Sequence, residues 1–265
     1  MKSAGNFFLQ FFIRYSLFVC SIFSSGCSDN AKKQSTTPAD DPSSNKASFP
    51  LPNPSSLNKF VASVRDGSID TTIAIDSLEK SLAAIKAYSI DQSLSLAPFD
   101  DWKFPLQGYS ITESIAEKDK GYIPGRYSFF QGNEHKGHPA LDIFIRDTDQ
   151  DMIDDRTGKE VSVLSVSSGI VIAVQPQWDT TSALRGGRYI WVYDPANDYL
   201  LYYAHNNRLL VTPGQWLQLG DVIATVGRSG ANAYKERSPT HLHFMLLKLD
   251  SNYYPRPVNP FPYLK

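Results

Sequence analysis

Hydrophobic positions in the second half of the chain fall into short runs that are separated by turn residues. The runs predict strands over residues 141–145, 161–166, 169–175, 188–194, 199–205, 221–227 and 241–249. Gly, Pro, Asp and Asn recur between these runs, as expected for turns. Because no helical pattern intervenes, the sequence predicts a mostly β fold over residues 98–265: a compact antiparallel sheet or barrel-like domain.

The hydrophobic pattern is helical upstream of this domain. Apolar side chains recur at helical spacing between residues 70 and 90, at Ile75, Leu78, Leu82 and Ile85. Asp70 precedes them as a candidate N-cap. We therefore expect a helical N-terminal segment over residues 59–97. Such a helix usually packs on the neighbouring domain, and shielding of an active-site groove is the alternative role.

The amino-terminal residues predict export. Residues 1–27 combine basic residues with a short apolar core, as in an export signal, and residues 28–58 are rich in Ser, Pro, Asn and Asp, as in a flexible linker. Cys27 follows small residues and resembles the lipidation cysteine of bacterial lipoproteins, although Ser24 stands where an aliphatic residue is usual. The alternative is an ordinary cleaved signal with an incidental cysteine. We expect an exported, membrane-anchored lipoprotein that faces the periplasm or the cell surface.

The composition and net charge of the chain limit the kinds of partner that we expect it to bind. The chain is 42% hydrophobic and 20% charged, as in ordinary globular proteins, and its formal net charge is −1. This charge gives no reason to expect nucleic-acid binding. Both cysteines, Cys20 and Cys27, lie in the predicted signal region, so the processed chain is expected to contain no internal disulfide.

Four of the five histidines lie in three short motifs that suggest metal chemistry. "HPALD" contains His138 and Asp142, "YYAHN" contains His205, and "THLHF" contains His241 and His243. In a strand, the last two side chains would project from one face. Two imidazoles and one carboxylate with an open fourth position are a usual way to hold catalytic zinc. The remaining imidazoles could carry protons near neutral pH.

These motifs also resemble a known family when taken in order. "GHPALDIF", "YYAHNNRLLVTPGQWLQLGDVIATVGRSG" and "PTHLHF" resemble the lysostaphin-type zinc metallopeptidases, which cut bacterial cell-wall peptides. The resemblance spans roughly residues 104–249. The chain departs from the family pattern at Ala140, where glycine is usual, in a longer acidic loop after Asp142, and in the stretch "ANAYKERSPT". Because these segments would line the rim of a groove, they affect the expected substrate preference.

The resemblance implies roles for the histidine motifs. It makes His138, Asp142 and His243 the ligands of one zinc ion. It makes His205 and His241 the catalytic pair beside the metal. It also implies a groove over the zinc site.

The function predicted on this basis is a zinc-dependent endopeptidase that hydrolyses peptidoglycan peptides, either the stem peptide or the crossbridge. A non-enzymatic peptidoglycan-binding module, or an activator of another wall hydrolase, is the alternative. A non-haem iron oxygenase is a third possibility, since two histidines and a carboxylate also describe that metal site. The additional histidines and the predicted export fit this third possibility poorly.

Other polar residues allow weaker predictions. Asp147, Asp149 and Asp151 alternate as in calcium-binding loops, but the EF-hand pattern fails at the positions of the glycine and of the final acid, and a solvated acidic loop is the alternative. His135 is interpreted as a loop residue. Tyr203 and Arg228 are candidates for lining the groove.

Overall fold

The computed structural model describes residues 51–115 and 121–264. The predicted export signal, including Cys27, and most of the predicted linker lie outside these residues. Within them, no helix combines the length and the apolar character needed to cross a membrane. The described residues lie in one compact unit, so the helical segment and the β domain are described together.

The described residues contain helices and strands in the predicted order. The helices are α1 (Pro54–Arg65), α2 (Thr71–Asp91) and α3 (Ile111–Ser114), with 3-10 helices η1 (Phe99–Asp101), η2 (Phe129–Glu134) and η3 (Phe261–Tyr263). The strands are β1 (Ala140–Phe144), β2 (Ser162–Leu164), β3 (Gly169–Gln175), β4 (Tyr189–Asp194), β5 (Tyr199–Ala204), β6 (Arg208–Leu209), β7 (Trp216–Leu217), β8 (Val222–Thr225), β9 (His241–Leu249) and β10 (Pro255–Val258). Each of the seven predicted strand segments contains a strand; β6, β7 and β10 were not predicted.

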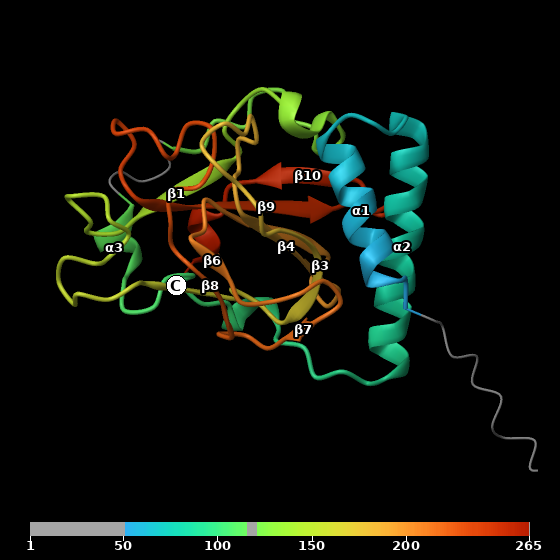
Figure 1. Ribbon diagram of the computed structural model, residues 1–265. Coiled ribbons are helices and arrows are strands. Elements are labelled where there is room, and N and C mark those ends of the chain that lie inside the picture. The colour runs from blue at the N-terminus through green and yellow to red at the C-terminus, as the bar shows by residue number, and fades with distance from the viewer. Residues whose placement is uncertain (1–50, 116–120, 265) are drawn as a thin grey trace, which may run out of the picture. The chain divides into compact units, whose positions relative to one another are not determined.

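Two antiparallel sheets form the body of the domain, which confirms the predicted fold class. The larger sheet has the order β1-β9-β5-β4-β3-β7, with β10 also paired to β9, and the smaller has the order β2-β8-β6. All of these pairings are antiparallel. Figure 1 shows helices α1 and α2 next to each other at one side of the strands.

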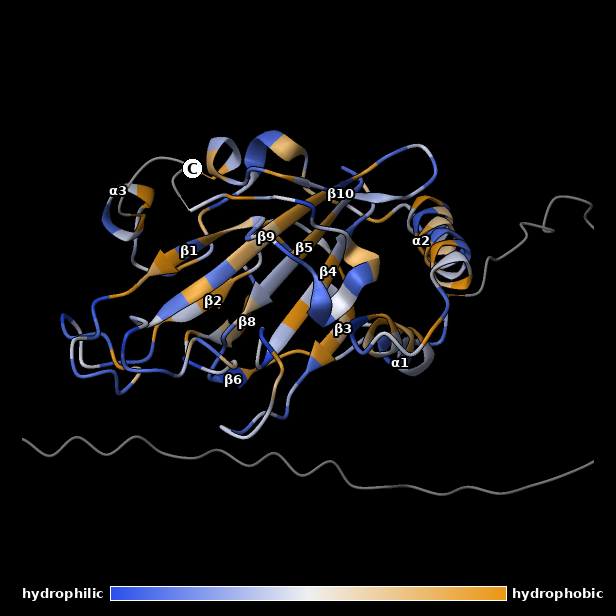
Figure 2. Cartoon of the chain, turned by 90° about the horizontal axis from the view of Figure 1, so that it is seen from above, coloured by the Kyte–Doolittle hydropathy of each residue, from blue (hydrophilic) through white to orange (hydrophobic). Residues whose placement is uncertain are grey.

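The larger sheet is covered on both faces, as its hydrophobic strands in Figure 2 indicate. Every residue of β4 is buried. Ile190 and Val192 belong to the core that includes residues of the smaller sheet, whereas Tyr189, Trp191 and Tyr193 belong to the core that includes α1 and α2. Side chains alternate across a strand, so the same division into a small-sheet face and a helix face continues along the neighbouring strands.

Helix α1 corrects the predicted boundary between linker and helical segment. The linker was predicted to end at residue 58, but α1 begins at Pro54. The Asn53 side chain accepts hydrogen bonds from the backbone of Ser55 and Ser56, and proline is well tolerated in the first turn. In addition, the Asn58 side chain accepts a 2.8 Å hydrogen bond from the backbone N–H of Val174 in β3. These polar residues therefore start the helix and attach it to the sheet.

Helix α2 agrees with the sequence prediction. The Asp70 side chain caps it by accepting hydrogen bonds from Thr72 and Ile73. Leu78, Leu82 and Ile85 are buried against the helix-facing core, as the spacing predicted. The helical segment therefore packs on the β domain.

Truncation of Leu82 tests the contribution of this packing to stability. The Leu82 side chain is fully buried, and a buried Leu→Ala change loses transfer free energy and leaves a cavity. We expect Leu82→Ala to lower the free energy of unfolding by about 2–5 kcal/mol. Ile73→Ala on the same helix is the control, because Ile73 is 58% exposed. Denaturant titration of both variants checks the difference; equal midpoints would contradict the packing of α2.

Candidate metal site

Strands β1 and β9 bring two of the three predicted ligands, Asp142 and His243, together on the helix-facing side of the larger sheet. The register pairs Asp142 with His243 directly. Their neighbours Leu141 and Leu242 belong to the core on the opposite face. Since alternate residues share a face, the alternation that buries these leucines places the carboxylate and the imidazole side by side.

His138 reaches the same point from the loop that precedes β1. Its backbone pairs with that of Ile123, and its Nδ1 atom lies 2.6 Å from the Gly121 carbonyl oxygen. Its Nε2 atom lies 3.2 Å from Asp142 Oδ1, and His243 Nδ1 lies 3.0 Å from the same oxygen. One potential ligand atom from each of the three side chains lies within 4.8 Å of the others. The structure thus brings the predicted ligand set together.

The protonation of these groups fits a metal cation. A carbonyl oxygen only accepts hydrogen bonds, so His138 Nδ1 is the donor to Gly121. Nε2 then donates to Asp142 in the protonated ring and carries the metal-binding lone pair in the neutral ring. Although burial opposes it, hydrogen bonding to His138 and His243 holds the pKa of Asp142 far below its usual range. Burial lowers the pKa of His243, which favours the neutral ring. Imidazole nitrogens and an ionised carboxylate form a donor set that suits zinc.

The predicted catalytic pair lies beside this cluster with a fixed orientation. His205 Nδ1 lies 2.7 Å from the Ser229 carbonyl oxygen, and His241 Nδ1 lies 2.7 Å from the Pro239 carbonyl oxygen. Each Nδ1 therefore carries a proton and donates it, which leaves Nε2 as the acid–base atom of the neutral ring. His241 Nε2 lies 3.6 Å from Asp142 Oδ1, next to the ligand cluster.

A left-handed backbone conformation explains why His205 reaches the site. Even-numbered residues of β5 contribute to the helix-facing core and odd-numbered ones to the small-sheet core. Continued alternation would direct His205 toward the small sheet, but its φ of +64° breaks the pattern. Its ring centroid lies 4.9 Å from that of His241 and 5.3 Å from that of His243. Burial lowers the pKa of His205 well below its usual value.

The cavity over these histidines includes residues that the sequence did not identify. It has a volume of about 190 Å³, and its lining includes His135, Arg185 and Tyr202 in addition to all five predicted site residues. His135 was interpreted only as a loop residue. Tyr202 and Arg185 gave no sequence signal, because only strand pairing and loop packing bring them to this face.

Tyr203 and Arg228 do not line the cavity, so both weaker predictions are wrong. Tyr203 lies on the opposite face of β5, where its hydroxyl accepts a 3.0 Å hydrogen bond from the Val166 backbone. Arg228 is buried and donates to the carbonyl oxygens of Ser238 and Lys235, at 2.7 and 3.1 Å. Arg228 thus holds the loop that leads into His241.

The acidic loop has internal partners of its own. Asp147, Asp149 and Asp151 do bring carboxylate oxygens within 4.8 Å of one another. Asp147, however, is buried and accepts hydrogen bonds from the backbone N–H groups of Asp151 and Met152 and from the Thr240 hydroxyl, at 3.0, 2.9 and 2.5 Å. These bonds account for the buried carboxylate as a loop anchor, without calcium.

Comparison with known proteins gives matches to one kind of domain. Residues 149–260 match peptidase family M23, a range that includes three of the site histidines and begins after His138 and Asp142. "Murein hydrolase activator NlpD" of Escherichia coli (strain K12) is 37% identical over 83 residues, 31% of this chain and 19% of the relative. "Lipoprotein NlpD/LppB homolog" of Pseudomonas aeruginosa is 32% identical over 102 residues, 38% of this chain and 29% of the relative. The chain therefore spans less than a third of these curated relatives.

One similar solved structure matches about half of the chain. "The antimicrobial peptidase lysostaphin from Staphylococcus simulans" is 24% identical, with 54% of this chain and 47% of that chain covered and a TM-score of 0.35.

Proposed function

Because residues 149–260 match peptidase family M23, we propose that the chain is a zinc-dependent endopeptidase that hydrolyses peptidoglycan peptides. One observation carries this proposal. Three metal-type donors and two imidazoles with free Nε2 atoms line one cavity, and backbone carbonyls orient both of those imidazoles. A module that only bound peptides would not need this arrangement of donors and proton carriers.

The proposed metal is one zinc ion held by His138, Asp142 and His243. Zinc bound there would polarise the scissile carbonyl group and lower the pKa of a water molecule, and so make a nucleophile available near neutral pH. Gly121 fixes the ring of His138 through its carbonyl oxygen, a contact of the kind that orients metal-binding histidines.

His205 and His241 would carry the proton transfers. With Nδ1–H donated to a backbone carbonyl, each Nε2 atom can accept a proton from the attacking water or, once protonated, donate a hydrogen bond to the developing oxyanion. The two rings come from different elements, His205 directly after β5 and His241 in β9, so one can serve the water while the other serves the carbonyl oxygen. This division of roles requires both side chains.

The proposed substrate and location follow from the similarity to the curated relatives. Peptidoglycan stem peptides or crossbridges would be the substrate, outside the cytoplasm. The relatives are named as a murein hydrolase activator and as a lipoprotein, which supports action at the cell wall and a lipid anchor at Cys27.

A second candidate function is activation of another wall hydrolase. It is favoured by the 37% identity to the murein hydrolase activator of Escherichia coli. In that case the groove would bind a partner or the wall, and the histidines would be dispensable for the cellular effect.

Digestion of purified sacculi distinguishes the two candidates. We expect the zinc-loaded protein to release fragments with new peptide ends, read by mass spectrometry, and a chelator to stop their release. Absence of cleavage by the zinc-loaded protein, together with faster release by an added wall amidase, would contradict the peptidase and support the activator.

Substitution of Gly230 tests the positioning of His205. Gly230 has a φ of +123°, and a Cβ there would lie 2.8 Å from His205 Nδ1 and would overlap the Arg185 carbonyl oxygen. We expect Gly230→Ala to lower kcat by about 100-fold, because a displacement of about 1 Å is enough for such a loss. Zinc content should not change, since none of the three atoms nearest to this Cβ belongs to a proposed ligand.

Gly158→Ala is the matched control for this substitution. Gly158 also has a positive φ, +65°, but a Cβ there meets nothing within 4 Å. We therefore expect Gly158→Ala to lower the free energy of unfolding by about 1 kcal/mol, because alanine is disfavoured in the left-handed region, and to leave the activity unchanged. Equal kcat values for the two variants would contradict the positioning role.

A further inference from the structure

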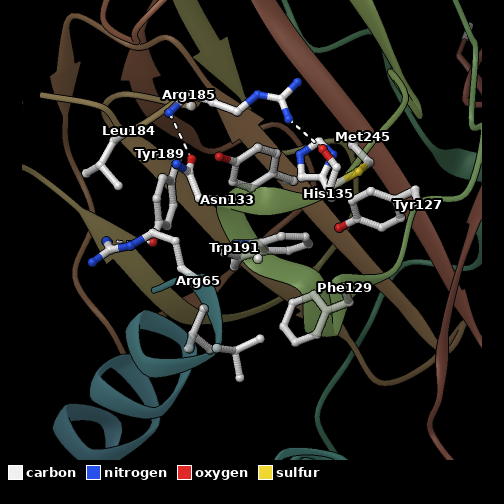
Figure 3. Close-up of a pocket in the computed structure, with 15 residues that line it drawn as sticks. Arg65, Tyr127, Phe129, Asn133, His135, Leu184, Arg185, Tyr189, Trp191 and Met245 are labelled. Atoms are coloured by element: carbon white, nitrogen blue, oxygen red, sulfur yellow. Dashed lines mark hydrogen bonds between the residues drawn. The ribbon is translucent and has the colours of Figure 1, made fainter. Parts of the chain in front are cut away.

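A second pocket opens beside the metal-site cavity, and we call it the α1 pocket because helix α1 forms one wall. Figure 3 shows aromatic side chains and two arginines around it. The lining residues are Val61, Val64, Arg65, Tyr127, Phe129, Gly132, Asn133, His135, Leu184, Arg185, Gly186, Tyr189, Trp191, Tyr202 and Met245. Its cavity volume is about 70 Å³. Four of these residues, His135, Arg185, Gly186 and Tyr202, also line the metal-site cavity, so the two pockets adjoin.

The inner wall of the α1 pocket is apolar and closely packed. Val64 of α1, Phe129 of η2 and Met245 of β9 are buried there. Trp191 lines the pocket but is only 6% exposed, so it does not present a ring face for stacking with a sugar. This wall suits a narrow aliphatic chain.

The charge at the pocket is positive. Its lining includes two arginines and no carboxylate. Arg65 is already neutralised by two 2.7 Å hydrogen bonds to the carboxylate of the adjacent Asp66. Arg185 is exposed and donates one N–H to the His135 carbonyl oxygen at 2.7 Å, and the structure gives it no carboxylate partner within 4 Å among the described residues. The guanidinium of Arg185 therefore has donors left for an anion.

A buried polar atom of His135 also points to a ligand. His135 Nδ1 is buried and has no hydrogen-bond partner. Buried polar atoms in folded proteins are almost always paired, so this atom calls for a partner from outside the described residues. Burial, together with the neighbouring Arg185, lowers the pKa of His135 to about 4, so the ring is neutral at pH 7 and can accept or donate one hydrogen bond.

We propose that the α1 pocket is a substrate subsite, which receives an aliphatic side chain ending in a carboxylate from the peptide that is cut at the metal site. Arg185 pairs with the carboxylate, and the apolar wall of α1, η2 and the larger sheet holds the aliphatic part. This inference rests on the proposed function for the identity of the peptide. Because α1 lies outside the residues matched to peptidase family M23, the subsite is a feature that the N-terminal helix adds to the domain.

Binding of soluble wall peptides tests the subsite separately from cleavage. The probe is the mixture of peptides that an amidase releases from purified sacculi, used before and after carbodiimide coupling with ammonia, which converts carboxylates to neutral carboxamides. Isothermal titration uses the full chain with the His205→Ala substitution, so that bound peptide is not cut. We expect amidation to weaken binding about tenfold, because a charge-assisted hydrogen bond is lost.

Arg185→Gln, added to this protein, identifies the responsible residue. We expect it to weaken binding of the untreated peptides about tenfold and to remove the effect of amidation. Arg256→Gln on β10 is the control, because Arg256 has a 65% exposed side chain and lies outside both pockets. Leu184→Trp, which fills the pocket from its rim, should weaken binding of both preparations.

The outcomes separate the subsite from the proposed function. Equal affinity for untreated and amidated peptides, no binding of either, or an amidation effect that persists in Arg185→Gln would overturn the subsite. Carboxylate-dependent binding by a protein whose histidines are intact but which cuts no sacculi would support the subsite and refute the peptidase. Cleavage of sacculi by a protein whose peptide binding does not depend on the carboxylate would support the peptidase and overturn the subsite.

Discussion

Replacement of Asp142 by asparagine is expected to remove zinc and abolish peptide cleavage together. Asp142 Oδ1 lies within 3.2 Å of a nitrogen of both His138 and His243, so its carboxylate is the centre of the proposed ligand set. Asparagine keeps the shape but loses the negative charge that offsets the cation. Loss of the metal removes several kcal/mol of transition-state stabilisation, so we expect kcat/KM to fall by at least about 10³-fold. Elemental analysis after dialysis measures the zinc.

The control for this substitution replaces another aspartate, Asp149 of the acidic loop, by asparagine. Asp149→Asn lies in the exposed part of the acidic loop, where the carboxylate contributes to no predicted zinc contact. It should keep one zinc per chain and normal cleavage. Zinc retained by Asp142→Asn at the level of the control would refute the assignment of this ligand.

The sequence predicted the β domain well because its strands are short apolar runs separated by turn residues. Strands β3, β4, β5 and β9 are rich in apolar residues, and each is buried for most of its length. The start of helix α1, in contrast, was assigned to the linker. Its first turn reads as a turn sequence, and what fixes it is the Asn53 cap and the contact between Asn58 and β3. That contact joins residues 116 positions apart, which a local pattern does not record.

The site was predictable to the extent that its residues share motifs. His241 and His243 lie on one face of β9, as the two-residue spacing indicates. The pairing of Asp142 with His243 required the register of β1 and β9, which only the resemblance implied. Arg185 and Tyr202 come to the site from a loop and a strand without a motif, so local sequence gave no sign of them.

Helix α1 affects both the comparison of the fold and the comparison of the site with the sequence. Its first turn lies outside the predicted helical segment, and the helix also forms one wall of the pocket beside the metal-site cavity. The helix predicted over residues 70–90, for which shielding of the groove was the alternative role, is α2, and none of its residues lines the metal-site cavity. In the structure, α1 packs on β3 and against η2 and borders a pocket beside the metal-site cavity, while none of its residues lines that cavity itself. This placement favours a contribution to substrate binding.

Replacement of His205 or His241 by alanine is expected to abolish cleavage and to leave the zinc in place. Neither side chain belongs to the cluster whose ligand atoms lie within 4.8 Å of one another, so the metal should stay at one per chain. Each ring, however, offers the Nε2 atom that the proton transfers require, with Nδ1–H held by Ser229 or Pro239. Loss of a general acid or base lowers the rate by about 10²–10⁴-fold, and we expect this loss in kcat.

The control for these variants is Asn232→Ala, which changes an exposed residue of the same cavity that has no acid–base function. It should retain kcat within about threefold, since surface substitutions away from the reacting groups cost little. Because the two imidazoles serve one reaction, the double variant should be hardly slower than either single variant. Zinc lost from His205→Ala or His241→Ala would instead make that histidine a ligand. Full kcat with the metal retained would remove it from the mechanism, and the other Nε2 atom would then have to serve both the water and the oxyanion.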